Sequence, residues 1–122
     1  MGEWTRDNFG NDGARDYLAM MTAKLVATIR EVVNDDERIA PDEDGESLLM
    51  PSVEILALLC ERCYAVPPRP ATVKQWREKY LVAFDAGAGR LRLTPERKAE
   101  RRRVIDNTFR WLESLSESYF ES

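Results

Sequence analysis

Residues 53–64 read Val-Glu-Ile-Leu-Ala-Leu-Leu-Cys-Glu-Arg-Cys-Tyr, and this stretch decides the fold. Wound as a helix, it leaves little polar surface, and a helix that is apolar nearly all round belongs in the middle of a fold. We expect the helix to begin between Ser47 and Ser52. We expect it to end near Val66, because the run Pro67-Pro68-Arg69-Pro70 cannot continue it. The sequence therefore predicts a central helix with other helices packed around it.

An amphipathic helix is predicted upstream, over residues 12–33. Asn11 is its expected N-cap, since a side-chain oxygen there can accept a hydrogen bond from a free backbone N–H group. Between the two helices, residues 34–46 are strongly acidic, with Pro41 and Gly45 as breakers, and they predict a solvated loop. The apolar side chains of the first helix recur at steps of three and four, at Tyr17, Leu18, Met21, Leu25, Ile29 and Val32.

A third helix is predicted after the proline run, which forms a stiff connector. Thr72 and Gln75 have the spacing of a capping box, in which the two side chains satisfy free N–H groups at a helix start. We expect this helix to continue to about Ala86. Gly87 and Gly89 supply the positive-φ positions that commonly end a helix.

A fourth helix is predicted from Thr94-Pro95, a cap followed by a proline at the first helical position, to about Tyr119. Residues 90–93 alternate between basic and apolar side chains and predict a short extended piece before it. Its apolar stripe would contain Val104, Ile105, Thr108, Phe109, Leu112, Leu115 and Tyr119. The predicted fold class is all-α: residues 1–122 form a single-domain irregular bundle of about four helices, with residues 1–11 as an ordered N-terminal aromatic segment packed on it.

Composition narrows the function classes. The chain has 122 residues, 43% of them hydrophobic, with no apolar run approaching a membrane span and a polar opening that does not resemble a signal peptide. We therefore expect a cytoplasmic protein without membrane association. The net charge of −4 argues against bulk attraction to nucleic acid. Its distribution is uneven, with a balance of −7 over residues 1–46, +1 over 47–86 and +2 over 87–122, which could steer a charged protein partner.

The amino-terminal region carries a pattern of seven residues: Trp4, Phe9, Asn11, Asp12, Ala14, Asp16 and Tyr17. This pattern resembles that of a bacterial family known as domain of unknown function 4259. Two positions depart from the family pattern, since Thr5 stands where Gly is usual and Asn8 where Pro is usual. The resemblance implies a small helical bacterial protein and no particular activity.

The aromatic side chains of this region, Trp4, Phe9 and Tyr17, have two interpretations. They can line a ligand pocket or an interface, where aromatic residues are enriched. Alternatively, Trp4 and Phe9 fold back to cover one end of the bundle, because aromatic residues dominate cores as readily as sites. The second interpretation is favoured here.

Asn11, Asp12 and Asp16, together with the acidic loop, suggest a divalent-cation site at first sight. An EF-hand loop needs oxygen ligands at positions one, three and five, Gly at six and Glu at twelve. The pattern is not met when either Gly13 or Gly45 is placed at position six of the loop. Helix capping and solubility explain these carboxylates better, so we expect no metal ligands and no cofactor.

Cys60 and Cys63 have C-x-x-C spacing, but they lie late in an apolar helix, not at the helix N-terminus that activates redox pairs. Zinc needs four ligands, and the chain has no other Cys and no His. We therefore assign the two cysteines to the core. Glu54 and Glu61 could act as paired carboxylates, but a place at the rim of the bundle is the favoured interpretation.

A basic cluster opens the fourth helix, at Arg97, Lys98, Arg101, Arg102 and Arg103. One interpretation is a docking patch for an acidic partner or for phosphate. The other is a solvated face whose positive charge balances the acidic first half of the chain, within the monomer or between subunits.

The chain lacks His and a phosphate-cradling glycine loop, and we identify no catalytic residues. We therefore expect a non-catalytic protein-binding or regulatory module, with the immunity type as one form of it, and with a protein partner or self-association. One alternative is a small carboxylate- or metal-dependent hydrolase that uses Asp12 and Asp16. A second is a structural homo-oligomer joined through exposed apolar residues on the third and fourth helices.

Overall fold

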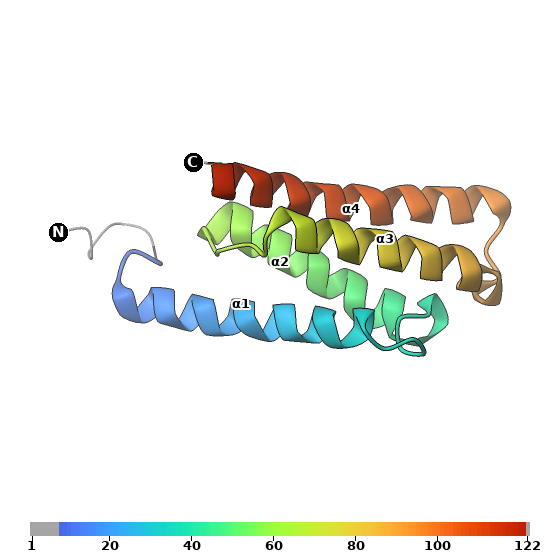
Figure 1. Ribbon diagram of the computed structural model, residues 1–122, viewed down its shortest axis with the longest axis horizontal. Helices are drawn as coiled ribbons and strands as arrows, with labels where there is room; N and C mark the ends of the chain where they lie inside the picture. The colour runs from blue at the N-terminus through green and yellow to red at the C-terminus, as the bar shows by residue number, and fades with distance from the viewer. Residues whose placement is uncertain (1–7, 122) are drawn as a thin grey trace.

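The computed structural model describes residues 8–121, and within them it contains only helices, turns and irregular segments (Figure 1). The all-α prediction is confirmed. In chain order the elements are α1 (Asp12–Val33), η1 (Pro41–Leu49), α2 (Met50–Cys63), α3 (Pro70–Gly87), η2 (Ala88–Leu91) and α4 (Pro95–Glu121). None of these helices has the length and apolarity that a bilayer span requires.

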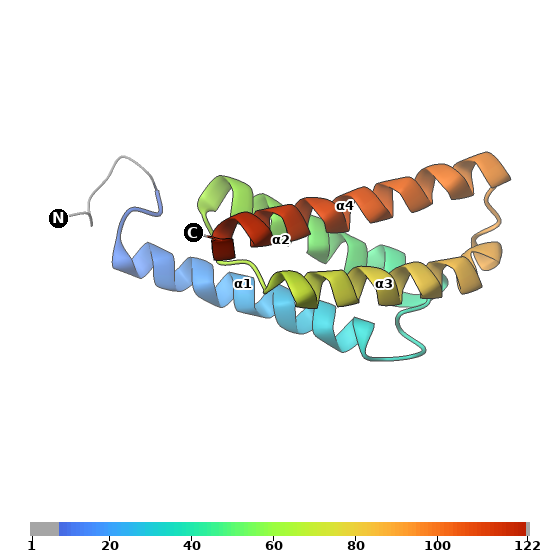
Figure 2. The same ribbon diagram turned by 45° about the horizontal axis from the view of Figure 1, so that its top comes forward.

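The four long helices form two antiparallel hairpins that pack on each other. α1 and α2 make one hairpin, α3 and α4 make the other, and α2 lies beside α4 with its chain running in the same direction (Figures 1 and 2). α4 packs most extensively against α3 and α2, whereas α1 contacts α2 and, less extensively, α3. The start of α1 therefore lies at the same end of the bundle as the ends of α2 and α4.

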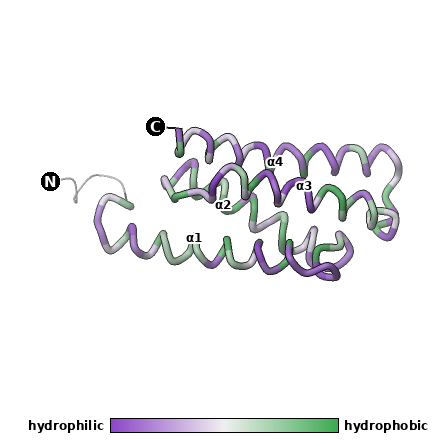
Figure 3. Tube along the Cα trace, in the orientation of Figure 1, coloured by the Kyte–Doolittle hydropathy of each residue, from purple (hydrophilic) through white to green (hydrophobic). Residues whose placement is uncertain are grey.

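The core lies between these helices. It is built mainly from large side chains that are fully buried, and Figure 3 shows that hydrophilic residues predominate along α4. α4 accordingly buries only one stripe of its surface. The largest buried side chains are Tyr80, Phe84, Phe109, Ile29, Leu49, Leu56, Ile105 and Leu112.

α1 begins and ends where the sequence predicts. The Asn11 side chain accepts a hydrogen bond of 2.9 Å from the backbone N–H of Ala14 and caps the helix. Phe9 is partly buried against the core, whereas Trp4 lies outside the described residues. The apolar stripe expected on this helix is not buried throughout, because Tyr17 is 59% and Met21 39% exposed.

The segment between α1 and α2 is more structured than the predicted solvated loop. Ile39, Pro41 and Gly45 are buried, and from Pro41 the chain forms η1, a helical segment that kinks at Glu43. The backbone N–H of Met50 donates to the Gly45 carbonyl oxygen, five residues back, which is a π-type hydrogen bond. The acidic composition does not reveal this packing, because Asp42 and Glu43 are exposed while Pro41 and Gly45 beside them are buried, and Glu46 turns inward to the Tyr80 hydroxyl.

Gly45 allows η1 to pack closely on α3. A Cβ atom at this position would lie 2.6 Å from both the Ile39 carbonyl oxygen and the Tyr80 ring. Such distances are essentially never seen for real side chains, so only a glycine permits this approach.

α2 is less central than predicted. It begins at Met50, within the predicted interval, but ends at Cys63 because Tyr64 adopts a left-handed conformation with φ of 64°. Ile55 and Leu58 are nearly half exposed, so the prediction of a helix buried on all sides is wrong. The helix has an outer apolar face that no other described element covers.

The connector and the start of α3 also differ in detail. α3 begins at Pro70 with Arg69 as its N-cap residue and no side-chain cap, so the predicted capping box at Thr72 is wrong. Proline pre-sets the helical φ angle at the first position, and the backbone N–H of Thr72 donates a hydrogen bond of 3.0 Å to the Arg69 carbonyl oxygen in place of a side-chain cap. The connector is held to α4, because the hydroxyl of Ser116 donates a hydrogen bond to the Pro68 carbonyl oxygen.

The turn between α3 and α4 does not use the glycines as predicted. Gly87 has a φ of −110°, and the left-handed position of this turn is occupied by Arg92. The predicted extended piece is instead the short helix η2. The start of α4 agrees with prediction, because the Thr94 hydroxyl accepts a hydrogen bond of 3.2 Å from the backbone N–H of Arg97.

We expect Gly45→Ala to lower the free energy of unfolding by about 2 kcal/mol, because the new methyl group overpacks the contact with Tyr80. Gly89→Ala is the matched control, since a Cβ there meets no atom within 4 Å. Its effect should stay within about 1 kcal/mol. Urea denaturation followed by circular dichroism measures both, and equal stability of the two variants would contradict the packing described here.

Candidate functional site: the groove between α2 and α4

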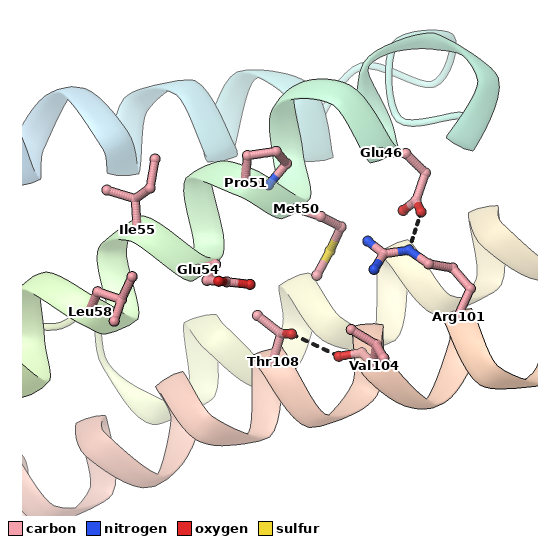
Figure 4. A pocket seen from close by; sticks show the side chains of 9 residues that line it. All are labelled: Glu46, Met50, Pro51, Glu54, Ile55, Leu58, Arg101, Val104 and Thr108. Carbon is pink, nitrogen blue, oxygen red and sulfur yellow. Dashed lines mark hydrogen bonds and ion pairs between the residues drawn. The ribbon is translucent and has the colours of Figure 1, made fainter.

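A groove of about 300 Å³ lies between α2 and α4, and we call it the α2–α4 groove (Figure 4). Its position follows from the packing of these two helices side by side in the same direction. It is lined by Glu46, Met50, Pro51, Glu54, Ile55, Leu58, Arg101, Val104 and Thr108.

The walls of this groove are unusually apolar for an exposed surface. Ile55, Leu58 and Val104 are each between 43% and 47% exposed. Figure 4 shows Leu58 on the side of α2 nearer α4, and Pro51 and Ile55 on its far rim. Single exposed apolar side chains are ordinary, but several around one concavity indicate a binding surface.

One end of the groove is closed by a polar network that joins three elements. The Tyr80 hydroxyl of α3 donates a hydrogen bond of 2.6 Å to one carboxylate oxygen of Glu46 in η1. The other oxygen accepts a hydrogen bond from Nε of Arg101 in α4, which also forms an ion pair with Glu46. Burial, and then the Glu46 carboxylate, raise the pKa of the Tyr80 hydroxyl well above its usual value, so this group stays a protonated donor.

Glu54 supplies the free charge of the groove. Within residues 8–121 it has no ion pair, and Figure 4 shows its carboxylate on the side of α2 that faces α4. The hydroxyl proton of Thr108, which also lines the groove, is already used in a hydrogen bond of 2.7 Å to the Val104 carbonyl oxygen. Glu61, about two turns further along α2, accepts a hydrogen bond of 2.9 Å from the Trp111 indole. Glu54 is therefore the carboxylate in this groove that an incoming cation can reach.

A second and larger groove, of about 770 Å³, lies at the end of the bundle where α1 begins, and we call it the Phe9 groove. It is mostly apolar, and the Nε–H of Arg15 donates a hydrogen bond of 3.2 Å to the Phe9 carbonyl oxygen at its edge. Its lining consists of Phe9, Gly10, Arg15, Leu18, Ala19, Thr22, Ala23, Cys63, Tyr64, Ala65, Val66 and Tyr119.

The predicted N-terminal site residues are only partly brought together. Phe9 lines the Phe9 groove, and Asn11 is the helix cap. Asp12, Asp16 and Tyr17 are exposed and line neither groove. Within residues 8–121, no group of three or more His, Cys, Asp or Glu side chains is placed to hold a metal ion.

The predicted basic cluster is divided over the surface of α4. Arg101 binds Glu46, and Arg102 forms a bidentate ion pair with Asp85 on α3, with hydrogen bonds of 2.8 and 3.0 Å. This contact holds the pKa of Asp85 below its usual range. Arg97 and Arg103 are exposed. Two of the four arginines thus have partners within the monomer, including one in the acidic half of the chain.

Comparisons with known proteins add no relative: no family model, no curated protein and no solved structure matches this chain. The resemblance to domain of unknown function 4259 therefore stays a prediction. Sequence reasoning missed Ile55, Leu58 and Val104 as site residues. The one available signal was that residues 53–64 are apolar on more faces than a helix at this position can bury.

The Glu46 network makes a prediction about stability. Tyr80→Phe should cost about 1 kcal/mol, because Glu46 keeps its contact with Arg101. Glu46→Leu should cost about 3 kcal/mol, because it leaves a buried hydroxyl and a guanidinium without their partner. The double variant should recover part of that loss, since it removes the orphaned hydroxyl. Denaturant titrations test this order, and a double variant with strictly additive losses would contradict the network.

The two cysteines should differ in reactivity. Burial raises the pKa of the Cys60 thiol to about 11, so at pH 8 only about one molecule in a thousand carries the reactive thiolate. Cys63 is partly exposed in the Phe9 groove. Iodoacetamide should therefore modify Cys63 first and Cys60 only after unfolding in urea, as measured by peptide mass spectrometry. Equal rates in the folded protein would contradict the placement of α2.

Proposed function

We propose that this protein is a non-catalytic protein-binding module and that its α2–α4 groove binds an amphipathic helix from a partner protein. The polar edge of that helix carries Lys or Arg. The observation that supports the proposal is that two half-exposed apolar side chains, Leu58 and Val104, lie on the same side of the groove as the unpaired carboxylate of Glu54, with the half-exposed Ile55 on the far rim.

The shape of the groove suits a helix. Two neighbouring helices leave a shallow channel between them, and an amphipathic helix can lay its apolar face there, with anchors spaced three and four residues apart. Leu58 and Val104 provide apolar contacts on the two walls. Burying these apolar side chains against a partner removes them from water, and this stabilises the complex.

The charge of the groove selects the partner. Glu46 is compensated by Arg101, whereas Glu54 forms no ion pair within residues 8–121. A buried carboxylate without a counter-charge is costly, so an apolar or acidic helix would leave Glu54 unpaired. A Lys or Arg at the edge of the bound helix removes that cost. Such a module acts by binding a helix of another protein and covering its apolar face, which is a regulatory or immunity-type role.

Binding of model peptides tests this proposal. The probe is a fluorescein-labelled amphipathic peptide of about 18 residues, long enough to form a helix, with Leu on one face and Lys at its edges. Its counterpart has Glu in place of Lys. We expect saturable binding of the Lys peptide in fluorescence anisotropy and at least tenfold weaker binding of the Glu peptide, because only Lys can pair with Glu54.

Variants locate the binding site. Leu58→Ser and Glu54→Gln should each weaken binding of the Lys peptide, by about tenfold and about fivefold, respectively. Val82→Ser is the matched control, because Val82 is 71% exposed on α3 and lines neither groove. Absence of saturable binding, or equal affinity for the Lys and Glu peptides, would overturn the proposal.

A further inference from the structure

The end of the bundle around the Phe9 groove carries a concentration of exposed aromatic side chains. Tyr64 and Tyr119, which line the groove, are 76% and 49% exposed, respectively, and the neighbouring Phe120 is 36% exposed. Tyr119 and Phe120 pack edge to face, with ring centroids 5.0 Å apart. The guanidinium of Arg69 lies 4.8 Å from the centre of the Phe120 ring. These contacts hold the aromatic side chains in place on the surface instead of burying them.

Tyr64 is the most unusual residue of this end. It terminates α2 in the left-handed conformation, with φ of 64° and ψ of 32°, at a position where helices commonly place Gly. A residue with a Cβ atom is unfavourable in this conformation. Burial in the monomer does not compensate for this, because the side chain is the most exposed of the large hydrophobic ones in residues 8–121. An exposed aromatic ring held in an unfavourable backbone conformation points to a contact outside the monomer.

The exposed aromatic area is a substantial part of what a dimer contact needs. An aromatic side chain buries on the order of 200 Å² when fully covered, so these three still expose on the order of 320 Å². Val66 and the walls of the groove add further apolar area. A stable contact between two proteins covers about 800 Å² on each partner, a little over half of it apolar, so this end of the bundle supplies most of the apolar part of such a contact.

The charges around this end suit a second copy of the same chain. Exposed charges of both signs flank the lining residues in the sequence: Asp12 and Asp16 on α1, Glu117 on α4, Arg62 beside Cys63, and Arg15, which itself lines the groove. Within residues 8–121 none of these five has an ion pair. In a contact related by a twofold axis the same patch faces itself, so each cation can meet a carboxylate of the other copy. The α2–α4 groove, with its single unpaired carboxylate, lacks this self-complementarity.

We infer that a second copy of this chain covers the Phe9 groove, in a symmetric dimer joined through the end of the bundle where α1 begins and α2 and α4 end. The ring of Tyr64 is the central contact of each copy. Cys63, beside it, becomes inaccessible in the dimer. This inference is independent of the function proposed for the α2–α4 groove, which lies on a different surface and stays open in such a dimer.

The oligomeric state of the full chain tests the inference. Light scattering coupled to size exclusion should give twice the chain mass of 14.1 kDa at high protein concentration. Alkylation of Cys63 should slow at least fivefold between micromolar and several hundred micromolar protein, because the dimer covers the thiol.

Tyr64→Gly separates a contact role from a structural one. Glycine suits the left-handed conformation, so the folded monomer should keep its melting temperature or gain in it, while the dimer dissociation constant rises at least tenfold. Val82→Ser, on α3, should leave the mass unchanged. A monomer at several hundred micromolar, or a dimer that Tyr64→Gly does not weaken, would overturn the inference. Concentration-independent protection of Cys63 in a monomer would do so as well, because it assigns the groove to another occupant.

Discussion

The close approach of Tyr80 to Gly45, which has no side chain, is the constraint on which the rest of this structure depends. It places the Tyr80 hydroxyl within hydrogen-bonding distance of Glu46, and Glu46 in turn binds Arg101. The Glu46 carboxylate of η1 thus joins a side chain of α3 to a side chain of α4. Because η1 leads directly into α2, this contact also sets where α2 starts and how it lies against α4. The α2–α4 groove is a consequence of that placement.

Local signals predicted the helices well, and long-range contacts explain where prediction failed. The bounds of α1 follow from an N-cap at Asn11 and a regular apolar spacing, both of which act within a few residues. The packed segment η1 could not be predicted, because its burial depends on Tyr80, which is far away in the sequence. The early end of α2 depends on Tyr64, a residue type that seldom adopts a left-handed conformation.

The candidate site was harder to predict than the fold, because a groove between helices exists only once the helices are packed. Arg101 was identified from its place in a basic cluster, but its partner Glu46 lies 55 residues away, and the pair closes the groove instead of forming a free docking patch. Ile55 and Leu58 were assigned to the core because they are apolar. Their exposure reflects the geometry of the bundle, in which four helices leave the outer face of α2 uncovered.

The shared direction of α2 and α4 has an electrostatic consequence. Each helix carries a partial positive charge of about half a unit at its N-terminus, and here both N-termini lie at the same end of the bundle. The acidic residues Asp42, Asp44 and Glu46 precede α2 at that end, and Asp42 and Glu46 pair with Arg90 and Arg101. At this end of the bundle the positive ends of the two helix dipoles and two arginines of the second half therefore face carboxylates of the acidic first half. Charges that lie far apart in the sequence offset one another here, so the charge that a partner meets at this end depends on the groups left unpaired and not on the net charge of either half.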